Sequence, residues 1–229
     1  MIDLKKINTL LFDLDGTLIN TEKEFYKAFY DILFHNYSII INENLYKKCE
    51  LDKNATLLDT LRISYDSIKN VTSEEIMDKV YSCYKQKFSN LVKSDEVVKK
   101  FEDLKILKKK GYTIGLVTTC KRIYLNILIK TLKIDDLFSC IIAREDVINL
   151  KPNSEAYLKA LKTLEKNAFE TIAIEDSKRG IVSALYAGLK VVKVDEYTTI
   201  KFSDNRCLEI NSVDELVEKL IDNTSKTNL

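Results

Sequence analysis

The feature that most constrains the fold is a set of short apolar runs that alternate with amphipathic segments. Five runs have the length and composition of buried strands, and a sixth near Cys207–Ile210 is typical of an edge strand. The five are continuously apolar, which is expected when helices cover both faces of a parallel sheet. They are Thr9–Asp13, Tyr112–Thr118, Ser139–Ala143, Thr171–Glu175 and Lys190–Val194.

The segments between these runs carry helix signals. Two predicted helices each place four large side chains on one face, and a third follows a capping box formed by Ser212 and Glu215. The first face is Val97, Phe101, Leu104 and Leu107; the second is Tyr157, Leu158, Leu161 and Leu164; the third helix carries Leu216, Val217 and Leu220. The alternation predicts an α/β protein with a doubly wound, Rossmann-like parallel sheet, whose ligands bind beyond the carboxyl ends of the strands.

One segment interrupts the alternation, because residues 18–91 carry helical signals only. Thr21 with Glu24, and Thr72 with Glu75, have the spacing of capping boxes, and weaker helices fit around 45–50 and 55–64. We therefore expect two domains: an α/β core formed by residues 1–17 and 92–229, and an inserted all-helical cap formed by residues 18–91.

Charge and cysteine usage exclude several classes of protein. The 36 Lys and Arg residues nearly balance the 35 Asp and Glu residues, so no overall field would recruit nucleic acid or an anionic membrane. The start of the chain lacks a signal-peptide apolar region, and no apolar run approaches the roughly 18 residues of a membrane span, so we expect a cytoplasmic protein. Cys49, Cys83, Cys120, Cys140 and Cys207 lack CxxC spacing, and we expect reduced, mostly buried thiols.

Two carboxylates, Asp13 and Asp15, stand at the end of the first predicted strand and are followed by Gly16. Along a strand this spacing places both side chains on one side, and the glycine lets the backbone turn closely around an anion. The plainer interpretation is a solvated Asp-Gly turn that caps the strand.

Three other strand ends carry polar residues. Thr118 and Thr119 precede a helix and suit a phosphate oxygen, although Thr118 also suits a simple helix N-cap. Lys151 precedes Pro152 and could neutralise a phosphate, although a lysine at a helix entry is usually a solvated surface residue. Glu175-Asp176 ends the fourth predicted strand, where adjacent acids are often caps.

The polar residues at the four strand ends indicate a functional site more strongly together than singly, because the carboxyl ends of parallel strands meet at one edge of the sheet. Asp13, Asp15, Glu175 and Asp176 would crowd negative charge into a small cleft, which is costly unless a hard cation is bound. Mg²⁺ is the natural candidate, since its shell of oxygen ligands suits carboxylates and no His or Cys cluster offers a softer metal a site.

In order and spacing these residues resemble the four motifs of the haloacid dehalogenase superfamily of phosphatases. The motifs are the run Asp13-Leu14-Asp15-Gly16-Thr17, the hydroxyl of Thr118, Lys151 followed by Pro152, and Glu175-Asp176-Ser177 with Gly180. The helical insertion is similar to the type-one cap of the branch that contains phosphoglycolate phosphatase and β-phosphoglucomutase. The resemblance covers nearly the whole chain.

The resemblance implies a role for each matching residue. Asp13 would be the nucleophile and a magnesium ligand, and Asp15 would be the general acid and base that also offers its backbone carbonyl to the metal. Asp176 would be the other direct carboxylate ligand, with Glu175 holding the metal or its water. Thr118 and Lys151 would bind the transferring phosphoryl group, together with the backbone N–H groups of Leu14, Asp15 and Thr119.

The function implied is a Mg²⁺-dependent phosphatase that hydrolyses a small phosphorylated metabolite through an aspartyl-phosphate intermediate. One alternative is a phosphosugar mutase of the β-phosphoglucomutase type. Such mutases carry a cap histidine soon after the first motif, whereas this chain has Glu24-Phe25-Tyr26 there, and its one histidine, His35, lies further on. The other alternative is a non-catalytic phosphate-binding module, but none of the four motifs is broken. The usual cap specificity loop is not recognisable in residues 48–53.

Overall fold

A computed structural model describes residues 2–46 and 57–225 and contains one six-stranded parallel sheet. The strand order is β3-β2-β1-β4-β5-β6, so the predicted fold class is confirmed. All six predicted strands are present, and the first three are shorter than predicted by one or two residues. The strands are β1 (Thr9–Phe12), β2 (Thr113–Val117), β3 (Cys140–Ile142), β4 (Thr171–Glu175), β5 (Lys190–Val194) and β6 (Cys207–Ile210).

The register of the central strands aligns their carboxyl ends. Phe12, the last residue of β1, pairs with Leu116 of β2 and with Ile174 of β4. Because the three strands run in the same direction, the residues that follow them emerge together at one edge of the sheet. That edge is where the sequence places its polar motifs.

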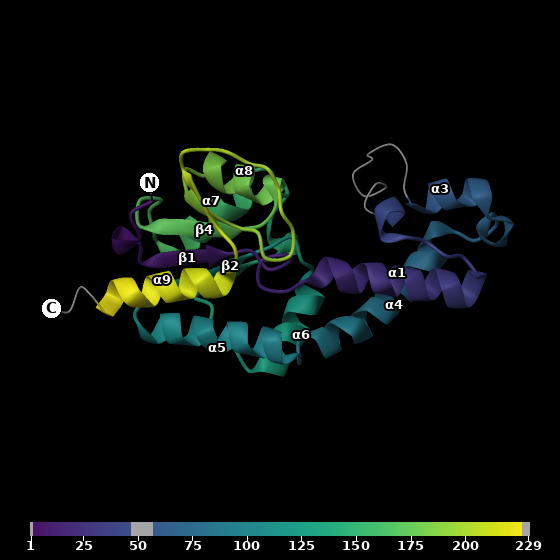
Figure 1. Cartoon of the computed structure of the whole chain (residues 1–229), viewed down its shortest axis with the longest axis horizontal. Helices are drawn as coiled ribbons and strands as arrows, with labels where there is room; N and C mark the ends of the chain where they lie inside the picture. Colours follow the sequence, from purple (N-terminus) through teal and green to yellow (C-terminus); the bar gives the residue numbers. More distant parts are fainter. Residues whose placement is uncertain (1, 47–56, 226–229) are drawn as a thin grey trace. The chain divides into compact units, whose positions relative to one another are not determined.

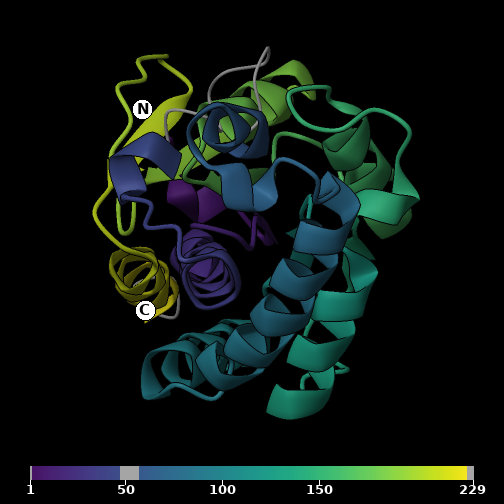
Figure 2. The ribbon, with the colours of Figure 1, turned by 90° about the vertical axis from the view of Figure 1, so that its right-hand side faces the viewer.

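Helices cover both faces of the sheet, as its continuously buried strands require. Figures 1 and 2 show α5 (Asp95–Lys109) and α9 (Val213–Ser225) on one face and α7 (Glu155–Leu164) and α8 (Lys178–Tyr186) on the other. Helix α6 (Arg122–Leu132) follows β2, and the short 3₁₀ helices η1 (Leu4–Lys6) and η3 (Arg144–Asp146) complete this part of the chain.

The buried face of α5 is the predicted one, but that of α7 differs. Leu158 is 49% exposed, and the buried residues of α7 are Ala156, Tyr157, Ala160 and Leu161. Ala156 and Ala160 belong to the buried cluster beside the sheet, whereas the adjacent Leu158 faces solvent. Predicting Leu158 as a core residue was therefore wrong, because the apolar pattern gave small alanines less weight than a leucine.

The chain separates into two compact units, one formed by residues 1–20 and 92–229 and the other by residues 21–91. The second unit is helical and contains α1 (Thr21–Tyr37), α3 (Leu57–Ser64), η2 (Asp66–Ile68) and α4 (Ser73–Leu91). Helices α1 and α4 pack against each other through apolar side chains. The buried members are Ala28, Phe29 and Leu33 of α1 and Ile76, Val80, Tyr84 and Phe88 of α4.

The capping box predicted before α4 is present in full. The backbone N–H of Thr72 donates to Glu75 Oε2 at 2.9 Å, and the N–H of Glu75 donates to Thr72 Oγ1 at 3.1 Å. At 45–50, residues up to Tyr46 are helical, while the rest of that predicted helix, the loop at 48–53 and Cys49 lie outside the described residues.

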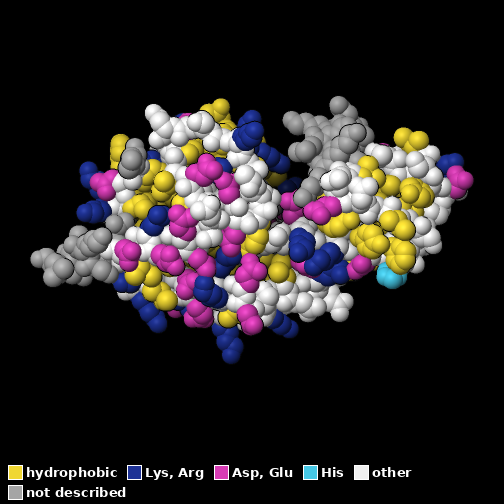
Figure 3. All heavy atoms as spheres, viewed as in Figure 1, with side chains coloured by type: hydrophobic (Ala, Val, Ile, Leu, Met, Phe, Trp, Pro, Cys, Tyr) yellow, Lys and Arg dark blue, Asp and Glu magenta, His cyan; other side chains and the backbone are white. Residues whose placement is uncertain are grey.

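On the face shown in Figure 3, Lys and Arg side chains are interspersed with Asp and Glu side chains. Of the described cysteines, Cys120 and Cys140 are buried, Cys83 and Cys207 are half-buried, and all four are free thiols. Among the helices that the structure describes, none combines the length and the apolar character needed to cross a membrane.

Candidate active site

Asp13 lies at the carboxyl end of β1 and is held there by the neighbouring strand. Its backbone N–H donates to the carbonyl of Ile174 in β4 at 2.9 Å, and the residue is only 7% exposed. The carboxylate is therefore fixed at the edge of the sheet where β2 and β4 also end.

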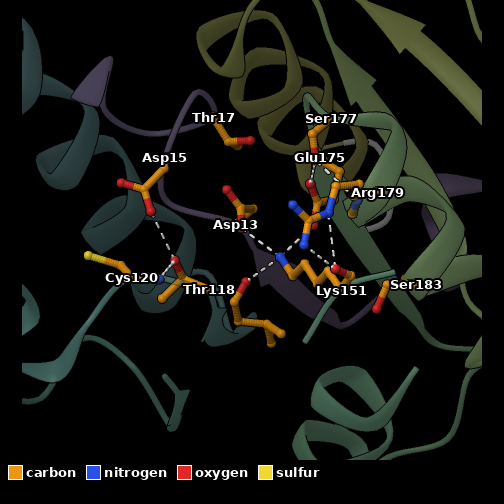
Figure 4. A network of polar contacts seen from close by, with 12 residues as sticks. Asp13, Asp15, Thr17, Thr118, Cys120, Lys151, Glu175, Ser177, Arg179 and Ser183 are labelled. Carbon is orange, nitrogen blue, oxygen red and sulfur yellow. Dashed lines mark hydrogen bonds and ion pairs between the residues drawn. The ribbon is translucent and has the colours of Figure 1, made fainter. Parts of the chain in front are cut away.

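Lys151 joins Asp13 to Glu175, the last residue of β4. Its Nζ donates to Asp13 Oδ1 at 2.6 Å, to Glu175 Oε1 at 2.6 Å and to the carbonyl of Val117 at 2.8 Å (Figure 4). The lysine is 4% exposed, so the interpretation of a solvated surface residue was wrong. Burial alone would lower the pKa of Lys151, but the carboxylates of Asp13 and Glu175 outweigh it, so the pKa is raised and the ammonium stays charged.

The backbone of Lys151 is fixed as well. The Arg179 guanidinium in α8 donates twice to the Lys151 carbonyl, at 3.1 Å from Nε and 2.7 Å from Nη2. Figure 4 shows this guanidinium beside Glu175, so α8 contributes to holding the lysine at the site.

Three buried carboxylates converge at this edge. Asp13, Glu175 and Asp176 each offer one oxygen, and these oxygens lie within 4.8 Å of one another. Burial raises the pKa of Asp13 well above its usual range, and Lys151 offsets this only in part. Burial, with the Glu175 carboxylate second, raises the pKa of Asp176 to about 7. One ammonium cannot neutralise three carboxylates, so the oxygen donors and the excess negative charge fit a hard divalent cation.

Asp15 lies near these three acids, but its carboxylate faces Thr118. Thr118 Oγ1 donates to Asp15 Oδ2 at 3.2 Å, and the Asp15 carboxylate is not part of the group of three acids found among the described residues (Figure 4). The strand ends at Phe12 and the chain turns at Gly16, where φ is +88°, so strand alternation does not orient Asp15. The strand geometry from which we expected Asp13 and Asp15 to share one side therefore does not apply, because both residues lie beyond β1.

Thr118 follows β2 and is 3% exposed. Its hydroxyl accepts from the backbone N–H of Cys120 at 2.9 Å, and α6 begins at Arg122 with Lys121 as its N-cap. The N-cap interpretation of Thr118 was therefore wrong, and its hydroxyl faces Asp15 instead. The next residue, Thr119, is exposed.

The turn after β1 is closed by Leu14. This buried residue accepts at its carbonyl from the backbone N–H groups of Leu18 at 2.9 Å and Ile19 at 3.0 Å. Thr17 in the same turn donates from its hydroxyl to Asp176 Oδ1 at 3.1 Å. The turn thus connects the first motif directly to the acid that follows β4.

Two further residues shape the site around Glu175. Tyr157 in α7 donates from its hydroxyl to Glu175 Oε1 at 2.6 Å, and its ring centroid lies 5.1 Å from Lys151 Nζ. Helical periodicity identifies Tyr157 as a core residue but carries no signal for its hydroxyl. Gly180 in α8 leaves room for the acid, since a Cβ there would lie 1.9 Å from Glu175 Oε2.

The chain is similar to known proteins over most of its length. The family model described as haloacid dehalogenase-like hydrolase matches residues 10–194. A protein from Bacillus mycoides called pyrophosphatase PpaX is 34% identical over 222 residues, which cover 95% of this chain and 95% of that protein.

Solved structures show a similar fold. A haloacid dehalogenase superfamily hydrolase of subfamily IA from Geobacter sulfurreducens gives a TM-score of 0.72 at 19% identity, over 94% of this chain and 97% of that one. The β-phosphoglucomutase of Clostridium difficile gives a TM-score of 0.64 at 24% identity, over 96% and 98% of the two chains. At these identities the two likenesses concern the fold alone.

Proposed function

The chain belongs to the family of haloacid dehalogenase-like hydrolases and is a phosphatase, and from this premise we propose that it hydrolyses a small phosphorylated compound through Asp13 with the help of Mg²⁺. The observation that best supports this proposal is the contact between Asp13 Oδ1 and Lys151 Nζ at 2.6 Å, inside a group of three buried acids. A carboxylate oriented next to a fixed cation suits phosphoryl transfer, which needs placement and charge neutralisation more than a strong nucleophile, and a bound Mg²⁺ would favour the ionised form of Asp13.

In the first proposed step, a carboxylate oxygen of Asp13 attacks the phosphorus atom, and the bond between phosphorus and the leaving oxygen breaks. Asp15 gives its proton to that oxygen. The hydrogen bond from Thr118 to Asp15 Oδ2 supports this division of roles, because it keeps Asp15 apart from the Lys151 contact of Asp13. Lys151 balances the charge on Asp13 and on the phosphoryl group.

In the second proposed step, water attacks the phosphorus atom of the aspartyl phosphate. Asp15 now accepts a proton from that water, the bond to Asp13 breaks, and inorganic phosphate leaves. Thr118 and the backbone N–H groups of Leu14, Asp15 and Thr119 are proposed to hold the phosphoryl oxygens during both steps.

Asp13, Asp176, Glu175 and the backbone carbonyl of Asp15 would hold the metal ion. When bound, Mg²⁺ supplies positive charge to the phosphoryl oxygens. Thr17 steadies one Asp176 oxygen by the hydrogen bond at 3.1 Å, and Tyr157 steadies Glu175 by the hydrogen bond at 2.6 Å.

Inorganic pyrophosphate is the substrate we propose to test first, because the curated relative that is 34% identical over nearly the full length of both chains is called a pyrophosphatase. Phosphoglycolate, sugar phosphates and nucleotides complete the panel. The mutase alternative has little support, since His35 is exposed and lies against Phe34 with ring centroids 5.1 Å apart.

The experiment is a phosphate-release assay of the purified protein on this panel, with Mg²⁺ and with EDTA. Asp13→Asn should abolish release, whereas Asp135→Asn, which changes an exposed aspartate in the same unit, should leave it intact. Release that survives in EDTA or in Asp13→Asn would refute the mechanism. Consumption of a sugar phosphate without release of inorganic phosphate would indicate a mutase.

A further inference from the structure

The connection between β5 and β6 reaches the candidate site through Thr198. The Thr198 hydroxyl donates to Asp176 Oδ2 at 3.3 Å, and the Thr17 hydroxyl donates to the other oxygen, Oδ1, at 3.1 Å. The Asp176 carboxylate is therefore held between two threonines from opposite ends of the core sequence. Each carboxylate oxygen has two acceptor positions, so both hydrogen bonds are compatible with a metal ligand.

Two buried lysines fix the segment around Thr198, which we define as the anchored segment, residues 195–200. Lys193 at the end of β5 is 2% exposed, and its Nζ donates to Asp195 Oδ2 at 2.8 Å and to the carbonyl of Ile200 at 2.7 Å. The segment is thus tied to one buried ammonium near both of its ends. Thr198 lies between the two tied positions.

The second lysine comes from a distant helix. Lys100 of α5 is 3% exposed, bonds to the Glu196 carboxylate and the Tyr197 hydroxyl, and lies 4.7 Å from the Tyr197 ring centroid. Glu196 Oε2 also accepts from the backbone N–H of Val213, the first residue of α9, at 3.2 Å. A buried ammonium is costly unless it is paired, so these partners are held in place as long as Lys100 is buried.

The anchored segment links this network to Thr198. Tyr197 is the direct neighbour of Thr198, so the contacts that fix the Tyr197 ring and hydroxyl against Lys100, with Glu96 accepting from the same hydroxyl, also restrict the Thr198 backbone. Loss of the Lys100 contacts would loosen this restraint on the hydrogen bond from Thr198 to Asp176. Carboxylates that bind metals are oriented by their hydrogen-bond partners, whose loss typically weakens metal binding by about 10- to 100-fold.

We propose that Thr198, held by the Lys100 anchor, is a positioning residue that sets the orientation of Asp176 for binding Mg²⁺. This inference rests on the proposed function, because it takes Asp176 as a metal ligand. Neither Thr198 nor Lys100 touches the reacting atoms; Thr198 acts through Asp176, and Lys100 acts through Thr198.

The test is isothermal titration calorimetry of Mg²⁺ into the purified metal-free protein, without substrate. Thr198→Val should raise the dissociation constant by about 10-fold or more, and Thr198→Ser, which keeps the hydroxyl, should restore binding to near the wild-type value. Lys100→Met should weaken binding in the same direction. Lys99→Met is the matched control, because Lys99 lies on the same helix but is exposed and pairs with Asp214.

A double variant separates the anchor from a general structural effect. If Lys100 acts through Thr198, Lys100→Met combined with Thr198→Val should bind Mg²⁺ no more weakly than Thr198→Val alone. Should Lys100→Met fail to fold by circular dichroism, Tyr197→Leu replaces it, since it removes the ring and hydroxyl that Lys100 contacts.

The outcomes are distinct. Wild-type protein that binds no Mg²⁺ would overturn the proposed function itself. Wild-type binding that Thr198→Val leaves unchanged would overturn this inference alone. Additive losses in the double variant would show that Lys100 does not act through Thr198 and would overturn the anchor.

Discussion

Replacing Gly180 with alanine tests whether α8 must leave space for Glu175. An added Cβ would lie 1.9 Å from Glu175 Oε2 and 2.0 Å from its Cδ, whereas ordinary contacts begin near 3.4 Å. The carboxylate would have to shift by about 1.5 Å. It is fully buried and bonded to Lys151 and Tyr157, so the shift would break both hydrogen bonds.

The expected destabilisation follows from these contacts. Overpacking costs about 1–3 kcal/mol, and each lost hydrogen bond to a charged group about 1.5–3 kcal/mol. Alanine gains about 1 kcal/mol over glycine in helix propensity, so the net loss should be about 3 kcal/mol or more. A displacement of this size at a catalytic site should also lower kcat by about 100-fold.

The assay pairs urea unfolding with phosphate release, and Gly188→Ala is the matched control. Gly188 has φ +84°, and an added Cβ there would lie 3.8 Å from Ala168, so this variant should lose about 1–2 kcal/mol through backbone strain but keep its kcat. If Gly180→Ala were as stable as the wild type and as active, the close approach of α8 to Glu175 would not exist.

Three further changes test other parts of the site. Asp15→Asn should slow turnover by about 10²- to 10⁴-fold. With an aryl phosphate as substrate, this variant should retain phosphate on Asp13, which mass spectrometry of the quenched protein would detect. An adduct on another residue would overturn the assignment of Asp13 as the nucleophile. Tyr157→Phe removes the donor to Glu175 and should lower the free energy of unfolding by about 1.5–3 kcal/mol; an unchanged urea midpoint would argue against the bond. In the folded chain, burial raises the pKa of Asp176 from 3.8 to about 7, so the folded state favours the protonated acid. Without metal, the free energy of unfolding should therefore fall by on the order of 4 kcal/mol as the pH rises from about 4 to about 7. Thermal unfolding in EDTA should show this fall relative to Asp176→Asn, and Mg²⁺ should reverse it; parallel pH curves for the two proteins would contradict it.

The sheet was predictable because its strands carry their own signal. The runs Thr171–Glu175, Lys190–Val194 and Cys207–Ile210 coincide with β4, β5 and β6. The parallel order also made it possible to predict that Asp13 and Glu175 would come close together, since strands that run the same way end at the same edge. Their catalytic roles stay a prediction until they are tested.

Side-chain direction after a strand ends was less predictable. Asp15 lies beyond β1 in a turn with positive φ at Gly16, and its direction depends on Thr118, about 100 residues further along the chain. The i and i+2 rule applies only inside a strand. The prediction that Leu158 is a core residue failed for a related reason, because packing against the sheet rather than hydrophobicity decided which side of α7 is buried.

The network around Thr198 was not predicted. Lys100 lies on the apolar stripe of α5, between Val97 and Leu104, where a lysine side chain is expected to extend to solvent. Its partners Glu196 and Tyr197 lie nearly 100 residues away. The sequence pattern likewise places Tyr157 on an apolar helix face and gives no indication of the hydrogen bond that its hydroxyl donates to Glu175. Such contacts depend on tertiary structure and could not be deduced from spacing.

The register of the central strand has a consequence for synthesis on the ribosome. β1 is translated early, but its first partner, β2, follows about 100 residues later, and β4 about 160 residues later. At a translation rate of about 5–20 residues per second, β1 waits for several seconds without a neighbour. During that interval α1 and α4 can already pack, while the fully buried segment Thr9–Phe12 stays exposed. The first strand of the chain therefore stays without its sheet partners for most of synthesis, and it is the strand whose end positions Asp13.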